Sequence, residues 1–539
     1  MIDLSRTLLV ASLAAPLAFL CACFVRRWRR HALALQSLAP IPSLAAGLIG
    51  LNSAPMTYDL PVLGFTLRLD PFGALLLAVA ALLWMVVSAA LWHDRDPDNR
   101  FGVSWLLTMT GNIGVFIAGD LVSFYLVYAL VSIPAYGLFA FSDDTERKRA
   151  GAVYMAFTIL GEALLLLAFA MLVAGEPHGS VRISDVMNAL PASPWRDAAL
   201  GLIIAGFGMK IGMIPFNGWM PLTYNAAPIP AVAVLSGAGV KAGVIGLIRF
   251  LPLGVPLEGW GATLAAIGFL SAFYGVAYGL TQRNPKVILA YSSISQMGVI
   301  TAALGMALVN GHADASLNVA FYAANHLLVK ATLFLMIGAL AMRSEKLSNA
   351  SLVLVTALAL SLAGLPLTGG ALAKLAVKEE FAGGLAATLA TLSSIGTALL
   401  MTHFLIRLAL PLPGAAQECP RSLSRFWAVF ALGAILLPWV FYPSVDDVSN
   451  AVGFGKLIDG LWPVALGAGL ALMLRRLDWS LPEVPAGDSI VLEERAFNRL
   501  LKIGPPLEML DARLRQWPAA GVSLLLIILA LLTAGVSGS

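Results

Sequence analysis

Long apolar runs recur along almost the whole chain, and they limit its fold more than any other feature. A helix needs about 20 predominantly apolar residues to cross a bilayer, and runs of that length follow one another here. Counting them predicts about sixteen spans. Only 12% of the residues are charged, about half the share of a soluble domain. The expected fold is an all-α polytopic membrane protein with about 16 transmembrane helices.

Positively charged residues gather in alternate loops and predict the orientation of the spans. Loops of one set carry clusters such as Arg26 to Arg30, Arg147 to Arg149, and Arg475 with Arg476, whereas the other set carries few, such as Arg68 and Arg182. Cytoplasmic loops accumulate Lys and Arg. The first cluster follows the first apolar run, opposite to a cleaved signal peptide. We therefore expect a multi-pass protein of the inner (cytoplasmic) membrane with both termini on the outer side.

Several classes of function find no support in the sequence. The net charge of +4 is small and scattered, so we expect no nucleic-acid partner. Three cysteines form neither a disulfide framework nor a paired-cysteine metal site. No phosphate-binding glycine loop and no Ser, His, Asp constellation is visible. We therefore expect no metal, no cofactor and no bond-making chemistry in this chain.

The stretch from Gly206 to Phe250 carries the clearest functional signal. It contains two consecutive apolar segments joined by a Pro-rich turn, and each segment holds one lysine, Lys210 and Lys241. A lysine near the bilayer centre costs about 2.5 to 3.5 kcal/mol on insertion scales, so it usually marks an ion path. The alternative is snorkelling from a helix end. Apolar residues on both sides of Lys210 argue against it.

Six ionisable residues are predicted to lie inside membrane spans and to transfer protons. Desolvation lowers the pKa of buried lysines in general, which lets such amines exchange protons near neutral pH. A carboxylate nearby would hold its lysine charged. Glu162 and His326 also have structural alternatives: the glutamate could form a hydrogen bond between helices, and the histidine could be a core residue whose hydrogen bonds are satisfied. The candidates are Glu162, Lys210, Lys241, His326, Lys330 and Lys374.

Two five-helix blocks, residues 101–250 and 251–410, each contain an apolar span interrupted close to a lysine. Interrupted helices at corresponding places of two halves indicate a transport site built from inverted repeats. The lysine precedes the break in the first block and follows it in the second, as inversion requires. The breaks are predicted at Pro215 and Pro221 in the first block and at Pro366 and Gly369 in the second.

The remaining segments are expected to support these blocks. Residues 1–100 are predicted to form N-terminal scaffold helices, and residues 411–475 peripheral helices. Polar residues with spaced leucines predict an amphipathic segment over 476–517 on the cytoplasmic side, with a solvated loop as the alternative. Residues 518–539 are expected to contain a final transmembrane helix.

Four ordered segments resemble one known family. They are KIGMIPFNGWMPLTYNAAPIPAVAVLSGAGVKAGVIGLIRF, NPKVILAYSSISQMGVI, AANHLLVKATLFLMIGAL and LAGLPLTGGALAK. They resemble the antiporter-like subunits of respiratory complex I, Mrp cation/proton antiporters and membrane-bound hydrogenases, over about Asp70 to Leu410. The resemblance implies two inverted five-helix repeats that each form a proton half-channel, joined by a hydrophilic axis along the membrane.

The same resemblance assigns roles to the intramembrane residues. It implies that Lys210 belongs to the first broken helix and that Lys241 is the connecting lysine. His326 and Lys330 correspond to the central pair, and Lys374 to the terminal lysine of the second broken helix.

Two positions depart from the family pattern. The fifth span of the family usually carries a glutamate that pairs with the first lysine, but this chain has Ala129 there. Some relatives carry an acidic residue in the sixth span, so Glu162 is the expected replacement partner of Lys210. Tyr322 occupies a place where the family often has a histidine.

The predicted function is therefore proton translocation by one subunit of a multisubunit membrane complex. Expected partners are other integral membrane subunits, protons, lipids and, as a second candidate ion, sodium. A stand-alone cation/proton antiporter is one alternative. A membrane scaffold that docks a soluble enzyme, as in inorganic-carbon uptake, is the other.

Overall fold

The computed structural model describes residues 2–60, 64–92, 99–140, 144–341, 349–410, 423–477, 481–482, 484–487 and 490. The chain divides into two units, residues 1–486 and 487–539. Nearly all described residues belong to the first unit, which is a helical bundle. The predicted final helix and most of the predicted amphipathic segment lie outside the described residues.

The N-terminal part of the bundle contains four α-helices and a short hairpin. They are α1 (Ile2–Phe24), α2 (Arg29–Leu35), η1 (Gln36–Leu38), α3 (Ile41–Gly50), β1 (Met56–Asp59), β2 (Thr66–Leu69) and α4 (Pro71–Trp92). The next helices correspond to the first predicted block. They are α5 (Asn99–Ile117), α6 (Leu121–Ser132), η2 (Pro134–Leu138), α7 (Thr145–Ala174), α8 (Ile183–Ala189), η3 (Leu190–Ala192), α9 (Arg196–Ile211), α10 (Trp219–Ala226), α11 (Ile229–Val234), the π-helical turn η4 (Leu235–Gly239) and α12 (Lys241–Phe250).

The second predicted block and the helices after it complete the unit. The block contains α13 (Glu258–Leu280), α14 (Pro285–Asn310), α15 (Ala315–Ala341), α16 (Asn349–Ser361), α17 (Gly369–Ala376), η5 (Glu379–Phe381) and α18 (Gly384–Leu408). The later elements are α19 (Leu423–Phe441), η7 (Tyr442–Ser444), α20 (Val448–Ala451) and α21 (Phe454–Arg476).

Twelve helical segments among the described residues are long and apolar enough to cross a membrane. This confirms a polytopic helical membrane protein. α5 is not among the twelve, and it carries polar residues such as Asn99, Arg100 and Asn112 along an otherwise apolar helix. α9 has only 16 residues because the chain breaks after it. The predicted number of about sixteen is thus not reached within the described residues.

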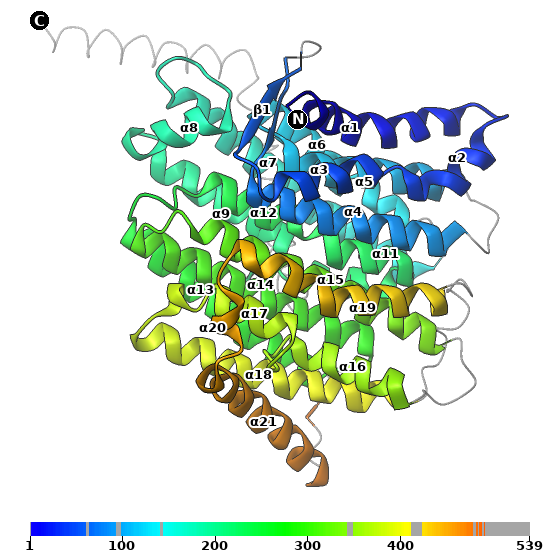
Figure 1. The fold of residues 1–539 in the computed structure, drawn as a ribbon, viewed down its shortest axis with the longest axis vertical. Coiled ribbons are helices and arrows are strands. Elements are labelled where there is room, and N and C mark those ends of the chain that lie inside the picture. Colours follow the sequence, from blue (N-terminus) through cyan, green and yellow to red (C-terminus); the bar gives the residue numbers. More distant parts are fainter. Residues whose placement is uncertain are drawn as a thin grey trace, which may run out of the picture. The chain divides into compact units, whose positions relative to one another are not determined.

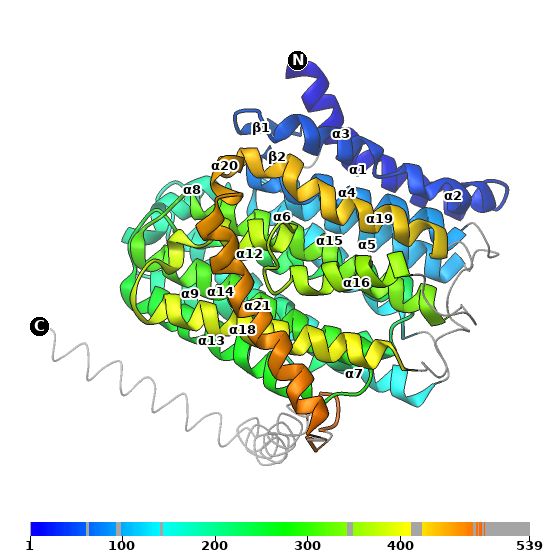
Figure 2. The ribbon, with the colours of Figure 1, turned by 60° about the horizontal axis from the view of Figure 1, so that its bottom comes forward.

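α15 lies at the centre of the bundle. It packs against α4, α11, α12, α14, α17 and α19. Figure 1 shows α1 to α4 at one end of the bundle, α18 and α21 at the other, and α12 and α15 between them. Figure 2 shows α19 beside α4 and α15, and it packs against both helices. A polar side chain on α15 can therefore meet groups from both blocks.

Small residues allow α13 and α14 to pack closely. A Cβ added at Gly268 would lie 2.5 Å from the backbone nitrogen of Ala302, and one added at Gly298 would lie 2.5 Å from that of Ala272. Only glycine permits so short a distance between helix backbones, a common device of membrane helices. α14 also has clear ends: the Asn284 side chain accepts a hydrogen bond from Lys286 N at its start, and Gly311 adopts the left-handed conformation at its end.

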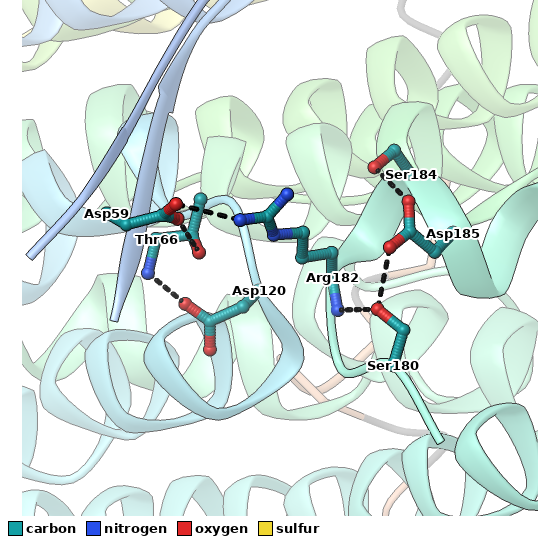
Figure 3. A network of polar contacts seen from close by, with 7 residues as sticks. All are labelled: Asp59, Thr66, Asp120, Ser180, Arg182, Ser184 and Asp185. Atoms are coloured by element: carbon teal, nitrogen blue, oxygen red, sulfur yellow. Dashed lines mark hydrogen bonds and ion pairs between the residues drawn. The ribbon is translucent and has the colours of Figure 1, made fainter. Parts of the chain in front are cut away.

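A polar network joins the hairpin to the loops around α6 and α8 (Figure 3). The Arg182 guanidinium contacts Asp59 at 2.7 Å. The Asp120 carboxylate accepts hydrogen bonds from Thr66 N and from Ser123 N, so it holds β2 and caps α6 at once. Hydrogen bonds from Ser180 and Ser184 lower the pKa of the Asp185 carboxyl. These contacts tie the hairpin to the first predicted block.

A buried ion pair makes a second such connection. Asp70 lies just before α4, and its Oδ2 is 3.5 Å from Nη2 of Arg249 near the end of α12. Both side chains are almost fully buried. The guanidinium also donates to the backbone oxygens of Phe116 and Ala118, and Asp70 accepts from Gly73 N. The pair thus joins α4, α5 and α12.

Replacing Asp70 with asparagine is expected to lower the free energy of unfolding by about 3 to 5 kcal/mol, because it leaves the Arg249 charge buried without its partner. Thermal unfolding of the detergent-purified protein would measure the change. Asp59→Asn is the matched control, since Asp59 and Arg182 are both more than half exposed and such pairs contribute about 1 kcal/mol or less. Equal effects of the two variants would contradict the prediction.

Candidate functional site

Lys210 lies where α9 breaks off inside the bundle. It is the second-last residue of α9, and Gly212 follows in the left-handed conformation that ends the helix. The Lys210 amine donates to Ser132 Oγ at 2.8 Å. It also lies 5.9 Å and 5.7 Å from the ring centres of Tyr128 and Tyr154. The amine is therefore held by a hydroxyl and by two aromatic faces.

Glu162 is placed on α7 next to this lysine. Its side chain is 7% exposed and close enough for electrostatic attraction to Lys210. Its Oε1 has no hydrogen-bond partner among the described residues. A small cavity beside Lys210 is lined by residues of α6, α7 and α9 and by Trp219 of α10. The Lys210 amine thus lies beside a space for about one water molecule.

Lys241 and His326 form the only direct contact between two predicted site residues that is seen in the described part of the chain. The Lys241 amine is 2.6 Å from His326 Nδ1 and donates to the backbone oxygen of Ser236 at 3.2 Å. Ser236 belongs to the π-helical turn before α12. Such turns leave carbonyls available to side chains and are frequent at functional sites. Lys241 and His326 are both fully buried.

Lys330 lies one helical turn beyond His326 on α15. Its amine donates to the backbone oxygen of Leu289 on α14 at 2.8 Å, and it is fully buried. The sequence indicated that His326 and Lys330 share a helix face, and the structure agrees. His326, however, is engaged by Lys241 of the other predicted block.

Lys374 lies on the short helix after the second break. Its amine donates to the backbone oxygen of Ala363 and to Ser394 Oγ, both at 2.6 Å. Ala363 belongs to the broken segment, and Ser394 to α18. The α17 helix packs tightly on α16 here, since a Cβ at Gly370 would collide with the backbone oxygen of Ser361.

A cleft of about 820 Å³ lies beside Lys374, and its lining includes residues of η5, η7 and α20. Its lining includes polar and charged side chains from several elements, which fits a space that water can enter. Tyr322 and Ser393 line it on the inner side. The charged residues of its lining are Lys374, Lys378, Glu379, Asp446, Lys456 and Asp459.

The predicted helix breaks lie at or next to the observed ones. Pro215 lies in the seven residues between α9 and α10, whereas Pro221 lies in the first turn of α10, where proline is tolerated. Pro366 lies between α16 and α17, and Gly369 is the first residue of α17. Lys210 precedes its break and Lys374 follows its own, as the sequence indicated.

Sequence analysis missed the side chains that accept hydrogen bonds from the amines of Lys210 and Lys374. Ser132 and Ser394 contact Lys210 and Lys374, but single serines on apolar helices are too common to attract notice. The Ser132 backbone oxygen in turn accepts a hydrogen bond from Tyr154 OH at 2.8 Å.

Comparison with known proteins finds similarity over more than half of the chain. The family model described as NADH:quinone oxidoreductase/Mrp antiporter, TM, matches residues 118–402, more than half of the chain. Hydrogenase-4 component B of Escherichia coli (strain K12) is 30% identical over 336 residues, which are 57% of this chain and 49% of that protein. The chain thus spans about half the length of that curated relative.

Two further similarities cover more of the chain. NADH-quinone oxidoreductase subunit N of Chromohalobacter salexigens is 26% identical over 466 residues, 78% of this chain and 93% of that protein. A solved Mrp complex from Dietzia sp. DQ12-45-1b contains a chain with a TM-score of 0.76 at 21% identity, covering 99% of this chain and 63% of that one. At this identity the likeness concerns the fold alone. By the match of its family model, which includes both helix breaks and all six ionisable candidates, the chain belongs to the family of NADH:quinone oxidoreductase and Mrp antiporter transmembrane proteins.

Proposed function

We propose that this chain moves protons across the membrane as an antiporter-like subunit of a larger complex. The observation that carries the proposal is the row of amines inside the bundle. Lys210, Lys241, Lys330 and Lys374 come from four different helices, and each donates to a hydroxyl or a backbone carbonyl. Intramembrane lysines are costly, and they are typical of ion and proton paths.

The proposed path starts at Glu162 and Lys210, passes Lys241 and the central pair of His326 and Lys330, and ends at Lys374. The cleft beside Lys374 would let water and protons reach the last amine. Between the amines, water molecules carry the proton. Buried polar atoms without a partner among the described residues support this, because such atoms usually bond to water. They include Glu162 Oε1, Ser236 Oγ, Ser295 Oγ, His326 Nε2 and Ser393 Oγ.

The finer architecture belongs to the same proposal. The two halves would be inverted five-helix repeats, residues 101–250 and 251–410, between scaffold helices in 1–100 and peripheral helices in 411–475. The opposite order of lysine and break in the two halves supports this. Adding α5, the broken α9–α10 and the broken α16–α17 to the twelve long segments, together with one helix in 518–539, would give the expected sixteen spans.

The membrane and the partners are also proposed. Arg-rich loops on one side favour the inner membrane with both termini outside. The apolar outer face of α21, with residues such as Phe454 and Met473 largely exposed, suits lipids or neighbouring subunits. Protons would be the transported ion, and sodium a second candidate.

The decisive experiment replaces Lys374 with alanine in the native complex, isolated through a tag on this chain. Everted membrane vesicles would report proton movement by acridine orange fluorescence, with NADH, H₂, Na⁺ and K⁺ tried in turn as the driving condition. We expect Lys374→Ala to reduce proton movement about tenfold or more, because a positioned proton-transfer group typically contributes at least that much. Assembly should persist.

Lys378→Ala is the matched control. Lys378 lines the same cleft but is exposed and pairs with Asp459 at 3.4 Å, so its loss should leave proton movement nearly unchanged. Unchanged proton movement in Lys374→Ala would overturn the proposal, as would the absence of any proton movement that depends on this chain. Proton and sodium flux in liposomes that contain this chain alone would test the alternative function. A stand-alone antiporter would show full coupled transport without partner subunits, whereas the proposed subunit would show little.

A further inference from the structure

We propose that Tyr322 positions the water that links the central His326 to Lys374, and that Gln296 and Thr397 fix its hydroxyl for this task. The inference rests on the proposed proton path and adds a positioning residue to it. It starts from three buried polar side chains on α14, α15 and α18 that form one continuous hydrogen-bonded chain.

The direction of every hydrogen bond in this chain is determined. Thr397 Oγ1 gives its single proton to the backbone oxygen of Ser393 at 2.8 Å. Its oxygen must therefore accept from Gln296, whose Nε2 lies 3.1 Å away. Gln296 Oε1 consequently faces Tyr322 and accepts from the Tyr322 hydroxyl at 2.8 Å. A hydroxyl has one proton and two lone pairs, so the Tyr322 oxygen keeps its lone pairs for accepting hydrogen bonds from water.

Tyr322 stands between the centre of the path and the cleft. It lies four residues before His326 and eight before Lys330, so the three side chains share one face of α15. His326 uses Nδ1 for Lys241, and its Nε2 has no hydrogen-bond partner in the described part of the chain. On its other side Tyr322 lines the cleft that also contains Lys374.

Among the residues that the structure describes, His326 and Lys374 make no hydrogen bond with each other, so in this proposal the proton crosses the gap between them on water. A water molecule that donates to the Tyr322 oxygen has its own lone pairs free. One lone pair accepts the Nε2 proton of a His326 imidazolium, while the water passes its other proton to the neutral amine of Lys374; transfer in the other direction uses the same atoms in reverse. Charge and atoms balance because His326 becomes neutral as Lys374 becomes charged, and the Tyr322 hydroxyl keeps its own proton, which stays hydrogen-bonded to Gln296 Oε1.

The test uses single substitutions in the native complex, with the vesicle assay described above. Tyr322→Phe removes only the hydroxyl and should reduce proton movement about tenfold, the rate equivalent of one well-positioned hydrogen bond. Tyr322→His should restore a large part of it, because imidazole nitrogens can also hold the water. Purely structural damage would not be repaired by so different a side chain.

Thr397 supplies a matched comparison on α18. Thr397→Val removes the acceptor of Gln296 and should reduce proton movement, whereas Thr397→Ser keeps the hydroxyl and should not. Thr402→Val is the control, since Thr402 Oγ1 donates only to the backbone oxygen of Ala398 within its own helix. Equal losses in Thr397→Val and Thr402→Val would indicate a packing effect and overturn the inference.

The outcomes separate this inference from the proposed function. Full activity of Tyr322→Phe, together with inactive Lys374→Ala, would refute the water link and leave the proton path standing. Full activity of Lys374→Ala would refute the path and the link with it. Should Tyr322→Phe fail to assemble, the Thr397→Val and Thr397→Ser pair decides.

Discussion

Replacing His326 with glutamine is expected to reduce coupled proton movement by about a hundredfold, the usual size of an effect on a proton-transferring side chain. Glutamine keeps a polar side chain of similar reach, but it does not take up or release protons near neutral pH. The Lys241 amine, now 2.6 Å from His326 Nδ1, would face a group unable to exchange its proton. Proton movement in everted vesicles, normalised to the amount of assembled complex, measures the effect.

His403→Gln is the control for this prediction. His403 also lies within a membrane helix, α18, and its Nε2 contacts the backbone oxygen of Gln282 at 2.9 Å. It contacts none of the six candidates, so its replacement should change proton movement less than about twofold. If His326→Gln retained activity equal to that of His403→Gln, the central part of the path would be wrong.

Replacing Glu162 with glutamine is the second change with a large expected effect. It removes the charge that attracts Lys210 while keeping the size of the side chain. We expect proton movement to fall about tenfold or more, because a neutral amide cannot hold or release the Lys210 proton. Glu258→Gln is the matched control, since Glu258 is an exposed residue in the first turn of α13.

A second substitution sharpens this prediction. Ala129 on α6 occupies the position where the family usually has a glutamate, and it lies three residues before Ser132, which contacts Lys210. Adding Ala129→Glu to the Glu162→Gln variant should restore much of the proton movement, because the carboxylate returns to the same lysine from another helix. Failure of this rescue, with the complex assembled, would contradict the assignment of Glu162 as the replacement partner.

The outer sites illustrate what local sequence predicts well. The breaks after Lys210 and before Lys374 were expected from Pro and Gly in otherwise apolar runs, and the structure has both. Proline and glycine act on the backbone of their own segment, so no knowledge of packing is needed. The partners of these lysines, Ser132 and Ser394, were not foreseen, because they come from other helices.

Arg249 shows the opposite case. The sequence shows only a positively charged residue at the end of an apolar run. In the structure Arg249 is buried and contacts Asp70, which lies 179 residues earlier. No periodicity connects two such distant positions. Tyr322 is similar: its departure from the family pattern was visible, but its bond to Gln296 depends on how α14 packs on α15.

The sequence by itself determined that this is a polytopic helical membrane protein, where its spans break, and which ionisable residues lie inside its apolar runs. These properties follow from length, apolar composition and backbone preference within each segment. The tertiary structure alone decided that His326 meets Lys241 from the other half of the protein, that Tyr322 is oriented through Gln296 and Thr397, and that a cleft leads to Lys374. Contacts between helices depend on the packing of whole surfaces, and a hydrogen bond requires that packing to place two atoms within about 3 Å.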